Sequence, residues 1–174
     1  HAAAVALLKL LDQHEISPDE ISRIKVKTFE EAIMLYQGHP TTTEEAQFSV
    51  KWPLACLVID RQLGPNQVLE HRLQDPQICA IMDKIDLVLD PEVDQMYKNT
   101  KETDLIMHSA VEITLKDGRH YDSGIIERGA DQFDEQSLEQ KFRRLTAFVL
   151  EPAQVDTLVK MVRDFENVPD VRQL

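Results

Sequence analysis

The chain has 174 residues, of which 43% are apolar, so it is long enough to form one domain with a hydrophobic core and is not a disordered tail. It contains no run of about 18 apolar residues, so the sequence predicts no transmembrane helix. The formal net charge of −12 argues against nucleic acid or an anionic membrane as a partner, because both bind clusters of Lys and Arg.

The first forty residues predict four short elements. They are a helix over 1–14, a tight helical turn over 17–20, a strand over 23–28 and a short helix over 30–36. The first helix opens at His1 with no Met and no capping Ser, Thr, Asp or Asn before it. Because natural helix starts usually carry such a cap, we expect residue 1 to be an interior position of a longer protein.

The stretch EEAQFSVKWPLACLVI, residues 44–59, predicts a helix that Thr42 or Thr43 caps and that runs to about residue 63. Pro53 falls in the middle of this predicted helix. A proline inside a helix costs on the order of 3 kcal/mol and frees a backbone carbonyl. The sequence therefore contains a break that its hydrophobic pattern does not explain.

The second half predicts a hairpin and several helices. In chain order, the elements are short helices over 67–73 and 76–84, a strand over 85–89, a loop over 91–107, strands over 111–115 and 119–127, and helices over 137–150 and 152–165. Asp117-Gly118 between the last two strands is a strong two-residue hairpin signal. The expected fold class is α+β: a two-layer sandwich of a roughly four-stranded, largely antiparallel sheet with helices on one face, plus C-terminal helices.

The two cysteines, Cys56 and Cys79, lie in apolar helical patterns and are expected to be buried free thiols. They indicate a reducing compartment, the cytoplasm, with the mitochondrial matrix as the open alternative. Two cysteines without a CxxC spacing are too few for a four-cysteine zinc site or an iron–sulfur cluster. The six histidines form no HxxxH or HExxH pair, and no GxGxxG, P-loop or GxSxG motif occurs, so no metal or other cofactor is expected.

Lys51 lies among apolar residues beside Trp52, and two interpretations stay open. Its stem could run along the helix while the ammonium group reaches water, or the ammonium group could be a cation beside an anionic ligand. The basic stripe of Arg23, Lys25 and Lys27 is explained most simply as a solvated sheet face. These residues by themselves predict no reaction.

The order of several segments resembles the C-terminal domain of the MmgE/PrpD family over residues 1 to about 165. The segments are His1-Ala2 at a helix start, ISRIKVKTF, EEAQFSVKWPLACLVIDRQLG, LQDPQICAIMDKIDLVLDPE, VEITLKDGRHYD and SLEQKFRRL. The family includes 2-methylcitrate dehydratase, cis-aconitate decarboxylase and an iminodisuccinate epimerase. A departure is GADQFDEQS after the hairpin, which lacks the prolines that family members often have there.

The resemblance implies a lid domain packed on a larger helical domain, with the active site in the cleft between them. Residues 1–150 would form the lid, and residues 151–174 a helix and tail that pack on the helical domain. Two explanations of Pro53 then remain open: a break that directs part of the helix toward the cleft or a partner subunit, or a tolerated kink. Family members are commonly dimers, so a homodimer is also expected.

The implied chemistry is metal-free proton abstraction next to a carboxylate of a small polycarboxylic acid, leading to dehydration, decarboxylation or epimerisation. His1 matches an active-site His of the family, and Tyr36 falls within about two residues of an active-site Tyr. Lys51 is the candidate for binding a substrate carboxylate. Two functions remain: the lid of such a lyase or isomerase, inactive without its helical half, or a non-catalytic α+β module that binds a ligand or a protein.

Overall fold

The computed structural model describes residues 2–100, 106–127, 134–168, 170 and 172. The chain divides into two compact units, residues 1–131 and residues 132–174, called here the N-terminal unit and the C-terminal unit. The domain boundary expected between residues 150 and 151 falls within the C-terminal unit and stays a prediction. Within the described residues, none of the helices combines the length and apolar character that crossing a bilayer requires.

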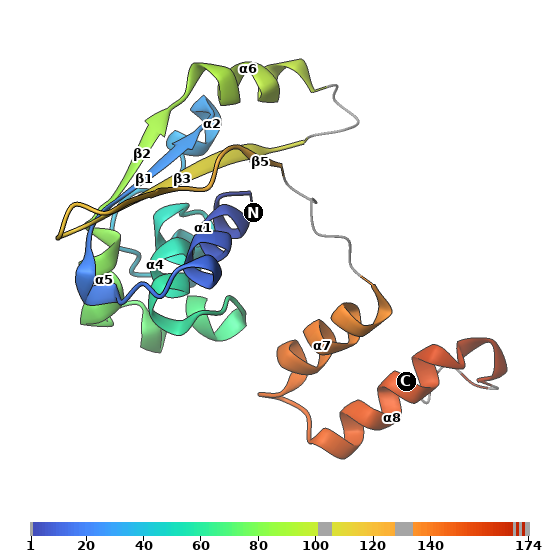
Figure 1. Ribbon diagram of the computed structural model, residues 1–174. Helices are drawn as coiled ribbons and strands as arrows, with labels where there is room; N and C mark the ends of the chain where they lie inside the picture. Colours follow the sequence, from blue (N-terminus) through green and yellow to red (C-terminus); the bar gives the residue numbers. More distant parts are fainter. Residues whose placement is uncertain (1, 101–105, 128–133, 169, 171, 173–174) are drawn as a thin grey trace. The chain divides into compact units, whose positions relative to one another are not determined.

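A mixed sheet forms the centre of the N-terminal unit (Figure 1). Its strands are β1 (Ile21–Thr28), β2 (Ile85–Leu89), β3 (His108–Leu115), β4 (His120–Asp122) and β5 (Ile126–Glu127). The order is β2-β1-β3-β4, and β5 also pairs with β3. The β1–β2 pair is parallel, whereas β1–β3, β3–β4 and β3–β5 are antiparallel.

The core lies between one face of this sheet and three helices, α1 (Ala2–Gln13), α4 (Lys51–Asp60) and α5 (Pro76–Met82) (Figure 1). The alternation of β1 sets this face, because Ile24 and Val26 are fully buried while Lys25 and Lys27 are only partly buried. The α+β class predicted from the sequence is confirmed. The predicted Asp117-Gly118 hairpin is confirmed too, and Gly118 adopts the positive φ of 89° that such a turn requires.

The remaining elements of the N-terminal unit are short. They are α2 (Glu30–Ile33), α3 (Thr43–Gln47), α6 (Pro91–Asn99) and the 3₁₀ turns η1 (Pro18–Glu20), η2 (Pro65–Val68) and η3 (Glu70–Arg72). Figure 1 shows α2 and α6 at the end of the sheet where β1 and β2 finish. A small second cluster contains Phe29, Tyr97 and Val93, and the Phe29 and Tyr97 rings stack with their centroids 4.0 Å apart.

The helix predicted over residues 43–63 is wrong, because the chain forms two helices there. α3 ends at Gln47, and α4 starts afresh at Lys51. Pro53 is therefore in the first turn of α4, where backbone N–H groups have no partner within the helix and the missing N–H costs little. Neither explanation of a mid-helix break is needed.

The loop predicted over residues 91–107 is wrong in its first half, where α6 forms. Asp90 caps this helix, since its carboxylate accepts hydrogen bonds from the N–H groups of Glu92 and Val93. Pro91 occupies the first helical position, which suits a fixed φ. The hydrophobic pattern missed α6 because Val93 is the one fully buried residue of this helix.

The C-terminal unit consists of α7 (Glu135–Thr146), α8 (Pro152–Arg163) and the turn η4 (Phe165–Asn167). Its ion pairs join the two helices, for example Arg143 to Asp156 at 2.6 Å and Arg163 to Glu139 at 2.7 Å. Of the residues described in this unit, Val155 alone has a buried side chain.

Candidate functional site

A closed loop carries one of the expected site residues, Tyr36. The backbone N–H of Tyr36 donates to the carbonyl of Phe48 at 3.0 Å, and Tyr36 forms an isolated parallel bridge with Ser49. The ends of the intervening segment, residues 37–48, are thereby held together. The segment contains α3 (Thr43–Gln47), and its two adjacent ends give it the closed form of an Ω-loop. We call residues 37–48 the site loop.

The phenol of Tyr36 points back into the site loop. Its hydroxyl donates to the backbone carbonyl of His39 at 3.1 Å. Gly38 makes this position available, because a Cβ at residue 38 would lie 2.9 Å from the phenol oxygen. His39 ties the loop to the end of α5, since its Nε2 lies 2.7 Å from Oδ1 of Asp83. The loop therefore holds the phenol at a defined position.

Glu45, in α3, reinforces the site loop. One of its carboxylate oxygens accepts two hydrogen bonds from Thr41, from the backbone N–H at 2.7 Å and from the hydroxyl at 2.9 Å. These bonds lower the pKa of Glu45, so it is an anion near neutral pH. Partial burial and then the charge of Glu45 raise the pKa of Tyr36. Tyr36 is a protonated hydrogen-bond donor near neutral pH, as an ordinary tyrosine is, and the shift acts in the same direction.

Lys51 follows the same bridge. Ser49 is buried, and its hydroxyl accepts a hydrogen bond from the N–H of Trp52 at 3.1 Å, which starts α4. Trp52 is fully buried and donates from Nε1 to the carbonyl of Gln67 at 2.8 Å. Lys51 is itself half-buried, in the first turn of this anchored helix. Across the described parts of the chain, no carboxylate forms an ion pair with Lys51.

A hollow of about 350 Å³ opens beside these residues. Its lining comes from the start of α1, the bridge and the start of α4: Ala3, Ala4, Leu35, Gln47, Ser49, Val50, Pro53, Leu54 and Leu63. Tyr36 and Lys51 are next in sequence to lining residues but do not line the hollow themselves. The hollow is largely apolar, and no carboxylate or imidazole is among its described lining groups.

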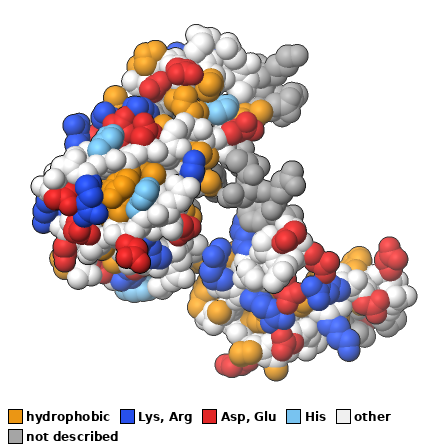
Figure 2. Space-filling view, in the orientation of Figure 1, with side chains coloured by type: hydrophobic (Ala, Val, Ile, Leu, Met, Phe, Trp, Pro, Cys, Tyr) orange, Lys and Arg blue, Asp and Glu red, His pale blue; other side chains and the backbone are white. Residues whose placement is uncertain are grey.

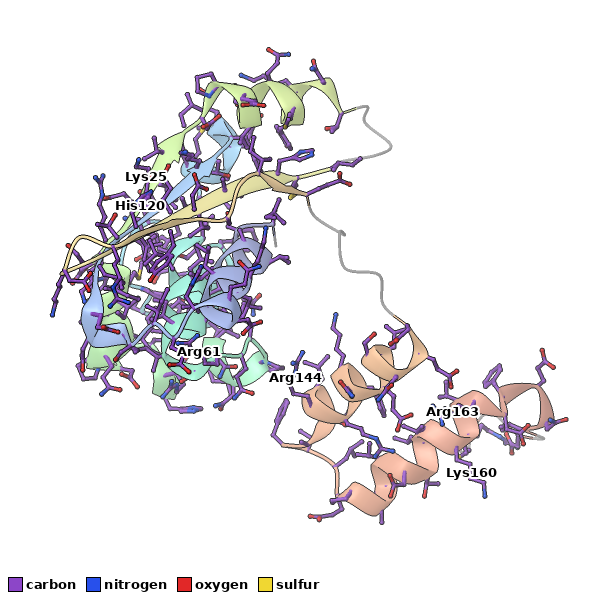
Figure 3. The ribbon with its side chains drawn as sticks, viewed as in Figure 1. Lys25, Arg61, His120, Arg144, Lys160 and Arg163 are labelled. Carbon is purple, nitrogen blue, oxygen red and sulfur yellow. The ribbon has the colours of Figure 1, made fainter. Side chains whose placement is uncertain are left out.

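The basic stripe on β1 does not form a free cationic site. Lys25 donates to Glu112 at 2.7 Å, Lys27 binds the other oxygen of the same carboxylate, and Arg23 pairs with Asp86 at 2.6 Å. The two lysines lower the pKa of Glu112 to about 2. Figures 2 and 3 show the result, acidic and basic side chains interleaved over the strands, with Lys25 and His120 over the same part of the sheet. The simpler interpretation, a solvated sheet face, fits these pairs.

The third expected site residue, His1, lies outside the described residues, so its place relative to Tyr36 and Lys51 stays a prediction. Within the described ranges, no group of three His, Cys, Asp or Glu side chains is arranged to hold a metal ion. Cys56 is buried, and burial raises the pKa of its thiol to about 12, so this thiol is not a nucleophile near neutral pH.

Sequence reasoning missed two residues of the site loop, Gly38 and Glu45. Neither residue belongs to a recognisable sequence motif. Their roles depend on the Tyr36–Ser49 bridge, which brings together segments that the sequence pattern treats separately. The sequence signal that remains is Glu45 three residues after the capping Thr42.

Comparisons with known proteins agree with the resemblance. The model of the MmgE/PrpD C-terminal domain matches residues 1–167. A human protein, cis-aconitate decarboxylase, is 20% identical over 172 residues, which cover 97% of this chain and 34% of that protein. The chain thus spans about a third of the length of the curated relative that it matches.

Proposed function

Because the chain belongs to the MmgE/PrpD family, whose C-terminal domain it carries, we propose that it is the lid of a lyase or isomerase acting on small polycarboxylic acids. The reaction begins with removal of a proton from carbon next to a carboxylate, without a metal ion. It continues to loss of water, as in 2-methylcitrate dehydratase, or to a related decarboxylation or epimerisation. The family match over residues 1–167 carries this proposal.

In this proposal the lid binds the substrate and donates a hydrogen bond to it, and it does not abstract the proton. Lys51 supplies a positive charge for a substrate carboxylate. The protonated Tyr36 phenol exchanges its hydrogen bond to the His39 carbonyl for one to negative charge that develops during the reaction. The described hollow has no carboxylate or imidazole in its lining. In this proposal the general base belongs to a helical domain of the same protein, with His1 at the edge of the lid.

The C-terminal unit supports the existence of this second domain. Its large apolar side chains are unusually exposed for such a small unit: Leu138, Phe142, Phe148, Val149, Val162 and Phe165. A helical hairpin with one buried side chain does not stabilise itself well, and exposed apolar clusters mark interaction surfaces. We assign these side chains to packing on the helical domain, which extends the expected contact of residues 151–174 to the whole hairpin.

The test compares the 174-residue chain with the product of the natural reading frame. Both are assayed with 2-methylcitrate, cis-aconitate and related acids by following the products directly. We expect turnover by the longer protein and none by the 174-residue chain. Turnover by the 174-residue chain would show that the base is inside it, and no turnover of any acid by the longer protein would refute the lyase or isomerase assignment.

Variants of the longer protein separate the two proposed roles. K51M should raise KM most, because it removes a charge that binds substrate, whereas Y36F should lower kcat most, because it removes a donor used in the reaction. Y97F is the matched control for Y36F, since Tyr97 stacks on Phe29 in a different cluster. Equal kinetics of Y36F and Y97F would remove Tyr36 from the mechanism.

A further inference from the structure

The phenol of Tyr36 is held by its own loop. It donates to the His39 carbonyl, and its oxygen and ring approach Gly38 so closely that a Cβ there would lie 2.9 Å from the oxygen and 3.1 Å from Cζ. Ordinary Cβ contacts are longer than this, so an alanine at residue 38 has to displace the phenol. Because the atoms that would clash belong to the far end of a side chain, the ring moves and the backbone does not.

The site loop also contains a carboxylate, that of Glu45, which contacts the loop itself. One carboxylate oxygen of Glu45 accepts hydrogen bonds from both the N–H and the hydroxyl of Thr41. In the chain, Thr41 follows His39 and the buried Pro40. This double contact fixes the part of the loop next to the His39 carbonyl, which accepts the hydrogen bond from the phenol. The neighbouring acid, Glu44, is exposed and makes no comparable contact within the described chain.

We propose that Gly38 and Glu45 are positioning residues for Tyr36: Gly38 leaves the space that the phenol occupies, and Glu45 fixes the loop whose His39 carbonyl accepts the hydrogen bond from the phenol. The proposal rests on the proposed function, in which Tyr36 donates a hydrogen bond to the substrate. It adds that the phenol is placed before substrate arrives, by a glycine and a carboxylate that need not touch the substrate.

The test is a titration of Tyr36 in the 174-residue chain, followed by NMR of tyrosine labelled at the ring carbon that carries the hydroxyl. The chain has three tyrosines, and Y36F identifies the Tyr36 signal. E45Q removes the charge with little change of shape, so we expect a lower pKa for Tyr36. E44Q removes the same charge from the same helix and is expected to leave the Tyr36 titration unchanged.

G38A gives a second, independent measurement. It should shift the Tyr36 ring signals and leave those of Tyr97 and Tyr121 in place, without lowering the melting temperature. Equal Tyr36 titrations in E45Q and E44Q, or unshifted Tyr36 signals in G38A, would overturn the proposal. These readouts need no turnover, so a failure of the lyase assignment would appear separately, as a longer protein that is inactive while both shifts are present.

Discussion

At the scale of single residues, the charged sheet face shows how one carboxylate contributes to the stability of the folded state. The Glu112 side chain is 11% exposed, and each of its oxygens binds a lysine. The unfolded chain has no such partners, so the pKa of Glu112 is lower in the folded state. A depressed carboxylate pKa contributes stability that is present above the ordinary value and is lost as the pH falls through the folded value.

For Glu112 this range runs from about 4.5 down to about 2. We expect E112Q to lower the free energy of unfolding near neutral pH by about 2 kcal/mol, because charged hydrogen bonds contribute about 1.5–3 kcal/mol. The difference between E112Q and wild type should shrink across that range. Denaturant unfolding at a series of pH values measures it, and a difference that does not depend on pH would contradict the assigned pairing.

Arg61 has a strained backbone conformation and a side chain that donates two hydrogen bonds. It ends α4 in the left-handed conformation, with φ of 55°, and its guanidinium donates to the carbonyls of Leu11 at 3.1 Å and Ile16 at 2.7 Å. These bonds hold the segment that leads from α1 to η1. The labelled side chain is visible in Figure 3.

Two substitutions separate these effects. R61A loses the hydrogen bonds and keeps the strain, so we expect it to lower the free energy of unfolding by about 2 kcal/mol. R61G loses the same bonds but relieves a backbone cost of about 1–2 kcal/mol, so it should be the more stable of the two by about 1 kcal/mol. Thermal unfolding of both variants checks the order, and R61A more stable than R61G would disprove the strain.

At the scale of elements, local signals explain what the sequence predicted and what it missed. The alternation in β1 and β3 and the Asp117-Gly118 turn identified the centre of the sheet because these signals span a few neighbouring residues. The parallel pairing of β1 with β2 was not predicted, since it depends on contacts between residues about sixty positions apart, such as Ile24 and Ile85. Tyr36 and Lys51 came from the family resemblance and from an apolar context, not from a motif.

The break between α3 and α4 shows a related limit of prediction from hydrophobic periodicity. Pro53 was placed inside a helix because the apolar run continues through it, while the start of α4 is set by Ser49, a residue fixed by its bridge to Tyr36. Periodicity therefore located the helical residues correctly but joined two helices into one.

This placement of Pro53 predicts a small effect of its removal. P53A should change the free energy of unfolding by less than about 1 kcal/mol, because a first-turn proline sacrifices no helical hydrogen bond. A55P, two residues further into α4, should cost about 3 kcal/mol or more. Urea unfolding of the two variants provides the comparison. A gain of about 3 kcal/mol in P53A would restore the single-helix interpretation.

At the scale of the whole molecule, the two units differ in how they are stabilised. The N-terminal unit has a continuous core between its sheet and helices, whereas the C-terminal unit buries Val155 alone among its described residues. Ion pairs such as Arg143–Asp156 are largely exposed, and exposed pairs contribute little. The packing within the hairpin by itself therefore contributes little to its stability.

This contrast gives a prediction for residues 134–172 made as a separate peptide. Its helicity by circular dichroism should be well below that of α7 and α8 in the structure, because short helices without packing are marginal in water. If the hairpin packs on a helical domain as proposed, the amides of α7 and α8 should exchange slowly with solvent in a protein that contains both. A separate peptide that is fully helical and monomeric would contradict this prediction.

The bridge between Tyr36 and Ser49 has a consequence for how such a protein diversifies. A segment pinned at both ends can be replaced by one of another length while the anchors keep their separation, and longer loops cost little in closure entropy. Residues 37–48 can therefore be exchanged as a unit. Replacing them with the corresponding segment of a relative, between the same two anchor residues, would change the surroundings of the Tyr36 phenol while the sheet and helices stay as they are.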